Sequence, residues 1–458
     1  MTYEGLMVSV SGVRGRVGEA LTPEIVARFA AGFGAWACSK AGTGLPARIV
    51  VGRDSRVSGP MFQAVVISAL QSVGCDVIDV GMAPTPTIQL AVEHHHAAGG
   101  LAITASHNPI EWNALKFIAP SGLFLDGAEA AEMRAVVEGK IPRAAWDQLG
   151  DIQRDDAAID RHIERILALP FIDVAAIRKR RFHVALDCVR GAGGTIMPAL
   201  LDRLGCKVSA INLETDGRFP RPPEPVAENL AELEQLVADS RADLGMAVDP
   251  DVDRLALVSE EGKAIGEDYT LALAAKTVLR RKVGVIVTNL STSRIMDDIA
   301  LEGGTRVIRA PVGEVNVATR MRAENSPIGG EGNGGVIVSD LHLGRDAPAG
   351  AALILQLLAD EAKPLSAVIA GYPRYIIVKD KMDRPKASLD AVYSALAAAF
   401  PDAERDTQDG LRLTWPDRWV HVRPSGTEPI VRVIAEAPSA EDALKLVADC
   451  RALLNKLK

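Results

Sequence analysis

The sequence predicts an α/β protein: three doubly wound α/β domains with mixed sheets, followed by a C-terminal α+β domain. Its 458 residues amount to several domains of roughly 150 residues each. Apolar residues make up 48% of the chain and charged residues 24%, a balance typical of proteins with packed cores. Helix and strand signals alternate along most of the chain, and three successive strand signals precede its last helix. We place the domains at 1–152, 153–257, 258–367 and 368–458.

In the first domain, buried strands alternate with helices. Thr22 and Pro23 have the residue types of a helix cap and a first-turn proline, and the segment Arg-Ile-Val-Val at 48–51 is typical of a short buried strand. The next elements are expected at 59–73 (helix), 75–80 (strand), 86–97 (helix) and 100–104 (strand). This order predicts a parallel sheet whose ligands gather at the carboxyl ends of its strands.

The same alternation restarts near residue 182 and again near residue 270. The second domain is expected to contain strands at 182–187, 207–211 and 244–248 and a helix at 193–204. The third is expected to contain helices at 270–279 and 347–362 and strands at 285–288, 306–308 and 335–338. In the fourth, strand signals at 411–415, 419–422 and 430–435 precede a helix at 440–456, which predicts an α+β arrangement.

Charge and composition restrict the classes of partner. Lys and Arg total 51 against 59 Asp and Glu, a formal charge of -8, which argues against a surface that neutralises nucleic-acid phosphates. Aromatic residues make up only 4%, too few for base-stacking platforms or interfacial belts. No apolar run approaches the roughly 18 residues of a membrane span. We therefore expect a small-molecule partner and neither nucleic acid nor a membrane.

The cysteines indicate a reducing compartment. There are five of them, an odd number, widely spaced and without a CxxC pair, which favours structural thiols over disulfides or zinc ligands. The first residues do not form a basic start followed by an apolar segment, so no signal peptide is expected. We expect a cytoplasmic protein; its oligomeric state has no signal in the sequence.

A serine loop follows the expected strand at 100–104. Residues 104–109 read Thr-Ala-Ser-His-Asn-Pro, so Ser106 stands on a tight turn where backbone N–H groups can face an anion. A serine in this position can carry a phosphoryl group. An isolated serine there would more simply be a turn residue.

An acidic loop follows the expected strand at 244–248. Asp249, Asp251 and Asp253 alternate along it, and an extended backbone would point all three carboxylates to one side as ligands for Mg²⁺. An EF-hand is excluded because Arg254 stands where that loop needs glycine and an apolar strand resumes at once. A solvated acidic turn is the simpler alternative.

Two further loops have the composition of ligand-binding segments. Residues 329–335 contain five glycines around Glu331 and Asn333, whose side chains can bind sugar hydroxyls, although a flexible turn would look the same. Near the C-terminus, hydroxyls, a glycine and guanidinium groups form the donor set that a phosphate monoester needs. These candidate phosphate-binding residues are Arg423, Ser425, Gly426, Thr427 and Arg432.

Together the four loops resemble those of the α-D-phosphohexomutase superfamily, which contains the phosphoglucomutase/phosphomannomutase family. In those enzymes a phosphoserine loop, an Asp-Pro-Asp-x-Asp-Arg metal loop, a sugar-specificity loop and a C-terminal phosphate loop follow one another in this order. The resemblance extends to 11–15, 52–56 and 223–230 and so covers nearly the whole chain. It implies four domains arranged around a central cleft.

The resemblance also implies a mechanism. Phosphorylated Ser106 would pass its phosphoryl group to a sugar monophosphate, and the resulting sugar 1,6-bisphosphate, which also acts as activator, would return its other phosphate to Ser106. Lys116 would serve as base near the reacting hydroxyl, while Arg14 and Arg254 would stabilise charge at the phosphoserine. His107 would either orient the loop or transfer a proton. The implied Mg²⁺ ligands are Asp249, Asp251, Asp253 and a phosphate oxygen on Ser106.

The sugar loop departs from the common pattern. Many relatives carry Gly-Glu-x-Ser-Gly-His there, whereas 331–335 reads Glu-Gly-Asn-Gly-Gly, so Asn333 replaces the serine and the histidine is missing. His342 would replace it only if the following turn folds back, and Glu314 occupies the place of a substrate-contacting residue. This loop and 112–116 look like the phosphoglucosamine mutase branch, which implies conversion of glucosamine 6-phosphate to glucosamine 1-phosphate. A phosphomannomutase or phosphoglucomutase is the alternative.

Two other classes of function use similar residues. A phosphatase with an aspartate nucleophile would also present Asp249 and Asp251 after an apolar strand. A non-catalytic sensor of sugar phosphates would keep the binding loops, but it would not need Ser106, Lys116 and all three aspartates. Both are weaker interpretations than a mutase.

Overall fold

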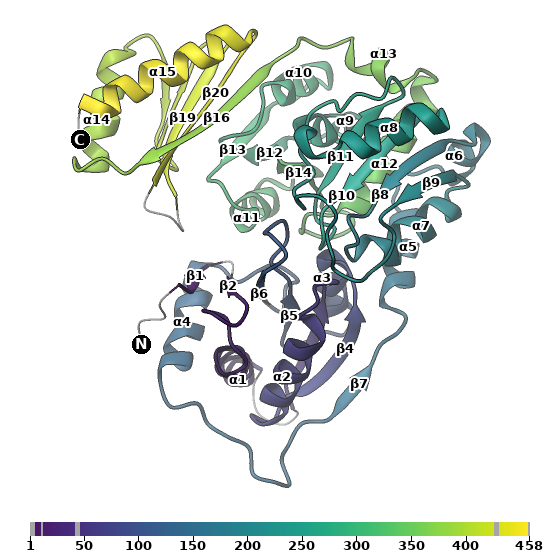
Figure 1. Ribbon diagram of the computed structural model, residues 1–458, viewed down its shortest axis with the longest axis vertical. Helices are drawn as coiled ribbons and strands as arrows, with labels where there is room; N and C mark the ends of the chain where they lie inside the picture. Colours follow the sequence, from purple (N-terminus) through teal and green to yellow (C-terminus); the bar gives the residue numbers. More distant parts are fainter. Residues whose placement is uncertain (1–4, 11, 42–45, 426–429, 457–458) are drawn as a thin grey trace.

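The computed structural model describes residues 5–10, 12–41, 46–425 and 430–456. Four sheets follow one another along the chain: a seven-stranded and two four-stranded sheets in mixed α/β layers, then a five-stranded antiparallel sheet. Figure 1 shows the N-terminal sheet at the bottom, the two central sheets at the upper right and the C-terminal sheet at the upper left. The predicted fold class is confirmed.

The N-terminal sheet has the strand order β1-β2-β6-β5-β3-β4-β7. Its strands are β1 (Met7–Ser9), β2 (Gly12–Arg16), β3 (Arg48–Arg53), β4 (Asp76–Met82), β5 (Gly99–Ile103), β6 (Trp112–Ile118) and β7 (Ile152–Arg154), and its helices are α1 (Pro23–Lys40), α2 (Gly59–Gln71), α3 (Thr85–His94) and α4 (Gly127–Glu138). The predicted parallel pairing of β5, β3 and β4 is confirmed. Strand β7 adds a further parallel pair, with β4, that was not predicted. The antiparallel edge of β6, β2 and β1 was not predicted.

Strand β3 shows why this sheet is buried on both faces. Ile49 and Val51 pack into one core with residues of α1, α2 and α4, while Val50 packs into another with residues of α3. Successive side chains of a strand point to opposite faces, so an uninterrupted apolar strand requires helices on both sides. The apolar residues 49–51 therefore specify a central strand.

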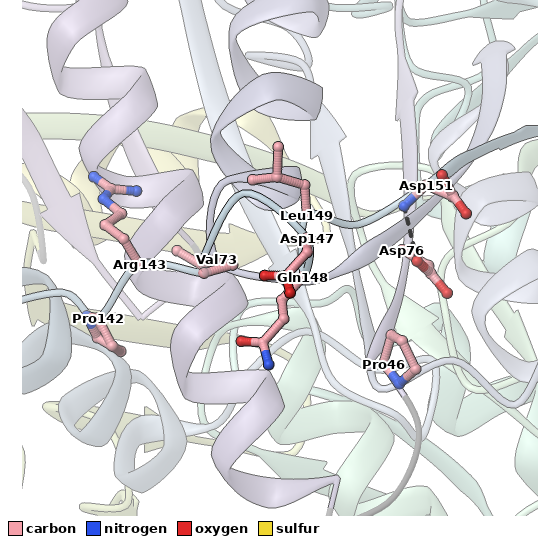
Figure 2. A pocket seen from close by; sticks show the side chains of 11 residues that line it. Pro46, Val73, Asp76, Pro142, Arg143, Asp147, Gln148, Leu149 and Asp151 are labelled. Carbon is pink, nitrogen blue, oxygen red and sulfur yellow. Dashed lines mark hydrogen bonds between the residues drawn. The ribbon is translucent and has the colours of Figure 1, made fainter.

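The segment that precedes β7 lies against the turn between α2 and β4. The backbone N–H of Asp151 donates to Asp76 Oδ1 at 2.9 Å, the dashed contact in Figure 2. A surface cavity of about 510 Å³ lies here, lined by residues that include Val73, Asp76, Arg143 and Gln148. Because β4 begins at Asp76, this cavity is at the amino ends of the parallel strands.

The two central sheets share one hydrophobic core. Their strand orders are β11-β10-β8-β9 and β13-β12-β14-β15, and each has one antiparallel edge strand. The strands are β8 (His183–Asp187), β9 (Lys207–Ile211), β10 (Leu244–Val248), β11 (Leu255–Ser259), β12 (Ile286–Asn289), β13 (Val307–Ala310), β14 (Ile328–Glu331) and β15 (Gly335–Val338). The helices are α5 (Ala158–Leu167), α6 (Val174–Arg180), α7 (Gly193–Arg203), α8 (Ala231–Ser240), α9 (Asp268–Leu279), α10 (Ile295–Glu302), α11 (Glu314–Glu324), α12 (Ala347–Glu361) and α13 (Leu365–Ile369). Helix α12 is buried along its first twelve residues, as expected of a helix that is apolar on all sides.

The C-terminal sheet has the strand order β16-β20-β19-β18-β17. Its elements are β16 (Ile376–Asp383), β17 (Glu404–Asp406), β18 (Leu411–Thr414), β19 (Trp419–Pro424), β20 (Ile430–Ala437), α14 (Leu389–Ala399) and α15 (Ala440–Lys456). It contacts the third sheet's unit through buried polar groups: the Arg294 backbone N–H donates to Glu436 Oε1 at 2.9 Å, and Ser291 Oγ lies 2.8 Å from His421 Nδ1. Among the helices described, none combines the length and apolar composition of a membrane span.

A buried arginine holds the serine loop against the N-terminal sheet. Arg56 is fully buried and pairs with Asp54 Oδ2 at 3.1 Å. Its two terminal nitrogens donate to four backbone carbonyls of the loop. These acceptors belong to Ser106, Asn108, Pro109 and Trp112, at 2.7, 2.7, 2.7 and 2.8 Å. One side chain thus supplies the hydrogen-bond donors for four carbonyl groups of the loop.

Replacing this arginine tests its role in stability. We expect Arg56→Ala to lower the free energy of unfolding by about 3–5 kcal/mol, because it leaves the Asp54 carboxylate and four carbonyls without their donor. The measurement is urea unfolding followed by circular dichroism. Arg48→Ala is the matched control: its side chain is exposed and donates to the His95 carbonyl, so a change within about 0.5 kcal/mol is expected. Equal changes in both variants would contradict this account.

Candidate active site

Ser106 lies in the loop after β5, with its backbone in the left-handed region at φ 47°. Its N–H donates to Thr104 Oγ1 at 2.9 Å, and only 3% of its surface is exposed. The hydroxyl donates to Asp249 Oδ2 at 2.8 Å and lies 3.3 Å from His107 Nδ1. The structure therefore brings the serine of the first sheet's unit against the acidic loop of the second.

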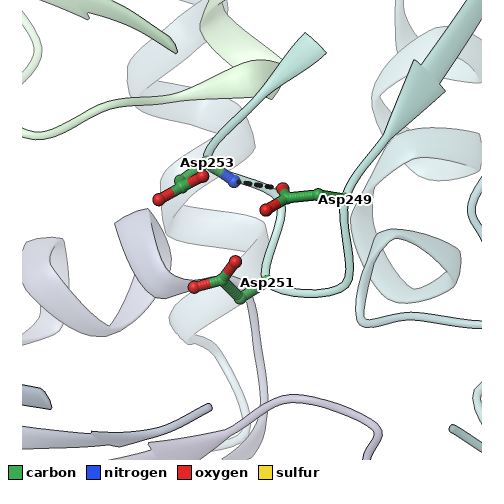
Figure 3. A group of neighbouring side chains, drawn as sticks. All are labelled: Asp249, Asp251 and Asp253. Atoms are coloured by element: carbon green, nitrogen blue, oxygen red, sulfur yellow. Dashed lines mark hydrogen bonds between the residues drawn. The ribbon is translucent and has the colours of Figure 1, made fainter. Parts of the chain in front are cut away.

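The acidic loop is a tight turn, and the expectation of an extended backbone is wrong. Val248 pairs with Leu255 in the antiparallel ladder of β10 and β11, so the chain must reverse within the residues between them. Val252 has a left-handed backbone, φ 63°. Asp249 Oδ1 accepts from the N–H of Asp253 at 3.1 Å, the dashed contact in Figure 3. The three carboxylates converge through this turn rather than through strand alternation.

The three aspartates fit a divalent cation. Oxygen atoms of Asp249, Asp251 and Asp253 lie within 4.8 Å of one another, and all three residues are buried. The Oδ1 atoms of Asp251 and Asp253 are buried without a hydrogen-bond partner. Burial raises the pKa of Asp249 well above its usual range, and the two neighbouring carboxylates raise it further. Oxygen ligands that repel one another in this way are the usual setting of a hard cation such as Mg²⁺.

Lys116 comes from β6, where it pairs in register with Ala102 of β5. Its Nζ donates to Asp251 Oδ2 at 2.7 Å, and Thr85 Oγ1 donates to the same oxygen at 2.8 Å. Burial favours the neutral form of Asp251, but the Lys116 ammonium and these hydrogen bonds hold its pKa below the usual range. One carboxylate oxygen is thereby occupied and the other is left for a cation.

Further cationic groups surround the serine. Arg14 donates to Asn108 Oδ1 at 2.6 Å, and burial lowers its pKa below the usual value. Arg254 donates to Glu224 Oε1 at 3.0 Å. The Arg254 guanidinium, burial and Arg14 together lower the pKa of His107 well below its usual value, so this imidazole is neutral at pH 7.

Arg345 connects the acidic loop, through Asp253, to the glycine-rich loop, through Glu331. Sequence reasoning did not identify Arg345 as a site residue. Arg345 donates to Asp253 Oδ2 at 2.5 Å and Glu331 Oε2 at 2.7 Å, and it lies 3.1 Å from Glu314 Oε2. Burial raises the pKa of Glu314. Burial acts on Glu331 in the same direction, but Arg345 and Asn289 hold its pKa below the usual range. The only signal in the sequence was an arginine next to a helix-capping aspartate, too common a pair to identify a site.

The glycine-rich loop is a hairpin turn between β14 and β15. Asn333 Oδ1 accepts from the Gly335 N–H at 3.2 Å. His342 does not take the place of the missing loop histidine. It is buried, its Nε2 lies 3.0 Å from Asp346 Oδ2, and its Nδ1 accepts from the Gly344 N–H. Both ring nitrogens are therefore occupied within the core.

The candidate phosphate loop begins at the end of β19. Arg423 and Arg432 are cross-strand partners in β19 and β20, and Ser425 follows β19 directly. Arg423 Nε lies 3.1 Å from Asp409 Oδ2, which also accepts from the Val312 N–H at 3.0 Å. This carboxylate ties the loop to the segment that precedes Glu314. Gly426 and Thr427 lie outside the described residues.

Profiles of one family match nearly the whole chain. Their descriptions are phosphoglucomutase/phosphomannomutase alpha/beta/alpha domains I, II and III, at residues 6–142, 160–262 and 266–375, and the C-terminal domain of the same family, at residues 375–453.

Individual relatives agree with these profiles. The chain is 42% identical to a "Phosphoglucomutase/phosphomannomutase" of Thermococcus kodakarensis and 39% identical to a "Probable phosphoglucosamine mutase" of Methanopyrus kandleri, each over 96% of both chains. A crystal structure of a phosphoglucomutase/phosphomannomutase family protein from Burkholderia thailandensis superposes with a TM-score of 0.85 over 98% of both chains, at 27% identity. The chain therefore belongs to the phosphoglucomutase/phosphomannomutase family and is an isomerase of the phosphohexomutase type.

Proposed function

We propose that this protein converts glucosamine 6-phosphate to glucosamine 1-phosphate by moving phosphoryl groups between Ser106 and the sugar. The observation that carries the proposal is the contact of 2.8 Å between Ser106 Oγ and Asp249 Oδ2. It joins a potential phosphoryl carrier to three converging carboxylates. A structural serine would not need such a partner.

The proposed cycle has two transfers. In the first, the phosphorus–oxygen bond at phosphorylated Ser106 breaks and a new one forms to the free hydroxyl oxygen of the sugar monophosphate, which gives a sugar 1,6-bisphosphate; the sugar hydroxyl loses its proton and Ser106 Oγ takes one up. In the second, the other phosphoryl group moves to Ser106 Oγ, which loses its proton, and the sugar oxygen that carried the group takes one up. Added 1,6-bisphosphate can therefore phosphorylate Ser106 and activate the enzyme. We assign the proton transfers to Lys116, which Asp251 positions beside this centre.

Charge control is the main task of such a site. Asp249, Asp251, Asp253 and a Ser106 phosphate oxygen would hold Mg²⁺, which when bound neutralises charge on the transferring group. Arg14, which donates to Asn108, and Arg254, which donates to Glu224, add further positive charge to the site. The neutral imidazole of His107 can hydrogen-bond to Ser106 without adding charge.

The sugar contacts are assigned to Glu314, Glu331 and Asn333. Glu314, Glu331 and Asp253 all contact the guanidinium of Arg345, and Asp253 Oδ1 also lies 3.7 Å from Arg254 Nε, so three carboxylates face two guanidinium groups and negative charge remains in excess. An ammonium group on the sugar complements that charge, whereas a neutral hydroxyl does not. This favours glucosamine phosphate, as do the names of several relatives. Glucose or mannose phosphate is the second candidate, because the relative at 42% identity carries the name phosphoglucomutase/phosphomannomutase.

The non-reacting phosphate is assigned to the C-terminal loop. The residues concerned are Arg423, Ser425, Gly426, Thr427 and Arg432. A guanidinium fork with neighbouring hydroxyls matches the oxygens of a phosphate monoester. Closing this unit over the bound sugar would also keep water from the phosphoserine.

Phosphate mapping tests the carrier. After incubation with a labelled sugar 1,6-bisphosphate, we expect label on Ser106 in the unmodified protein and none in Ser106→Ala, whose turnover should fall by about 10³-fold or more. Ser68→Ala is the control, because Ser68 is an exposed serine on α2 that donates to its own helix. Label on Asp249 would instead identify a phosphatase, and normal turnover of Ser106→Ala would exclude the cycle.

A panel of substrates tests the sugar. We expect kcat/KM for glucosamine 6-phosphate to exceed the values for glucose and mannose 6-phosphates by about tenfold or more, the effect of one favourable charged contact. Steady-state assays under identical Mg²⁺ and bisphosphate concentrations provide the comparison. A preference for glucose or mannose phosphate would replace the proposed substrate but leave the phosphoserine cycle in place.

Substitution of Arg423 tests the phosphate loop. We expect Arg423→Ala to raise KM about 10- to 100-fold with a smaller effect on kcat, since it removes a charge-assisted contact to the non-reacting phosphate. Arg418→Ala, on an exposed arginine beside Asp417, should leave both constants unchanged. An unaltered KM in Arg423→Ala would contradict the assignment.

A further inference from the structure

Two cysteines meet in the N-terminal unit, outside the proposed active site. Cys38 lies near the end of α1 and Cys75 directly before β4, yet their Sγ atoms are 3.2 Å apart. A disulfide bond is about 2.05 Å long, so the sulfurs need to approach by only about 1.2 Å to form one. No sequence pattern indicates this contact, since the two residues are 37 positions apart and belong to no CxxC motif.

The two thiols differ in access. Cys75 is fully buried in the core beneath α1 and α2, and its Sγ contacts the Gly34 carbonyl at 3.5 Å. Cys38 is only half-buried at the edge of that core. A small reagent from solvent therefore reaches Cys38 first and leaves Cys75 behind it as the second thiol. This is the arrangement of an attacking and a resolving cysteine.

The electrostatic setting favours the same order. The shared hydrogen bond lowers the pKa of Cys38 and raises the pKa of Cys75, which burial raises further, so Cys38 is the thiol of this pair that ionises more readily. Burial raises the pKa of Cys206 and Cys450 to about 12 and that of Cys188 well above its usual value. Cys38 is therefore the most readily ionised of the five cysteines, and its oxidation removes the thiolate that helps to hold the pKa of Cys75 high.

We propose that Cys38 and Cys75 form an oxidant-sensitive pair that hydroperoxides convert to an intramolecular disulfide. The Cys38 thiolate attacks one peroxide oxygen, the O–O bond breaks, and Cys38 becomes a sulfenic acid as hydroxide leaves and is protonated. Cys75 sulfur then attacks the Cys38 sulfur, its proton leaves, and the sulfenic oxygen departs as water. In sum, two thiols lose two electrons and two protons, and one hydrogen peroxide becomes two waters.

The pair lies at the end of the sheet opposite to Ser106. Cys75 precedes the amino end of β4, whereas Ser106 follows the carboxyl end of β5, and both strands run parallel to β3. Five residues of strand separate these two ends by roughly 16 Å. The inference is thus independent of the proposed phosphoryl transfer, and its test uses no activity measurement.

Thiol counting tests the proposal. Fully reduced protein is treated with equimolar hydrogen peroxide, quenched, unfolded and alkylated with iodoacetamide. We expect alkylation of three of the five cysteines, a loss of about 2 Da before alkylation, and recovery of all five thiols after reduction. Tryptic digestion without reduction should yield peptide 29–40 joined to peptide 57–116.

Cysteine-to-serine variants distinguish a specific Cys38–Cys75 disulfide from unspecific oxidation of the protein. Cys38→Ser, at a half-buried position, should keep its four remaining thiols under the same treatment, and Cys75→Ser should form no crosslink. Cys206→Ser, the control, should still join 29–40 to 57–116. Five alkylated cysteines in treated native protein would overturn the proposal. So would a crosslink at another pair, or a sulfinic acid on Cys38 with Cys75 still free.

Discussion

One buried guanidinium sets the geometry on which the site depends. Arg56 uses its side-chain donors on Asp54 and on four carbonyls of the segment from Ser106 to Trp112. A loop with its carbonyls turned inward onto one cation has little freedom to rearrange, which allows Ser106 to remain in a left-handed conformation that non-glycine residues seldom adopt. The Ser106 hydroxyl is thereby aimed at Asp249, in another unit of the chain.

The three carboxylates of the acidic loop are compensated by cationic side chains from other parts of the chain. Three buried carboxylates are costly unless cations compensate them. Lys116 from the first unit binds Asp251, and Arg345 from the third binds Asp253. The Oδ1 atoms of Asp251 and Asp253 accept no hydrogen bond, and oxygens of the three aspartates lie within 4.8 Å of one another, so a divalent cation bound there would complete the balance. Lys116 and Arg345 thus reduce the cost of burying the carboxylates, and they also connect the acidic loop to the first and third units.

Arg345 also explains how the sugar loop is coupled to the metal turn. Its guanidinium contacts Glu314 and Glu331 as well as Asp253, so a change at either acidic group alters the field at the other. Asp409 plays a comparable part at the C-terminal unit, because it pairs with Arg423 and accepts from the Val312 backbone. In the proposed cycle, in which both ends of a bisphosphate react in turn, such connections would let several loops respond to one ligand.

Local residue chemistry was enough to predict the fold class, more than half of the strands, about half of the α-helices, and the serine, acidic, glycine-rich and arginine-rich loops, because those signals lie within a few neighbouring residues. The domain limits and the role of each site residue stay predictions. Only the tertiary structure revealed the tight turn at Asp249, the anchoring by Arg56, the bridge made by Arg345 and the pairing of Cys38 with Cys75. Each of these depends on residues that are distant in the chain or on a change of backbone direction. Residue type and spacing carry no information about which distant partner a buried charge or thiol will find, and packing of the sheets decides it.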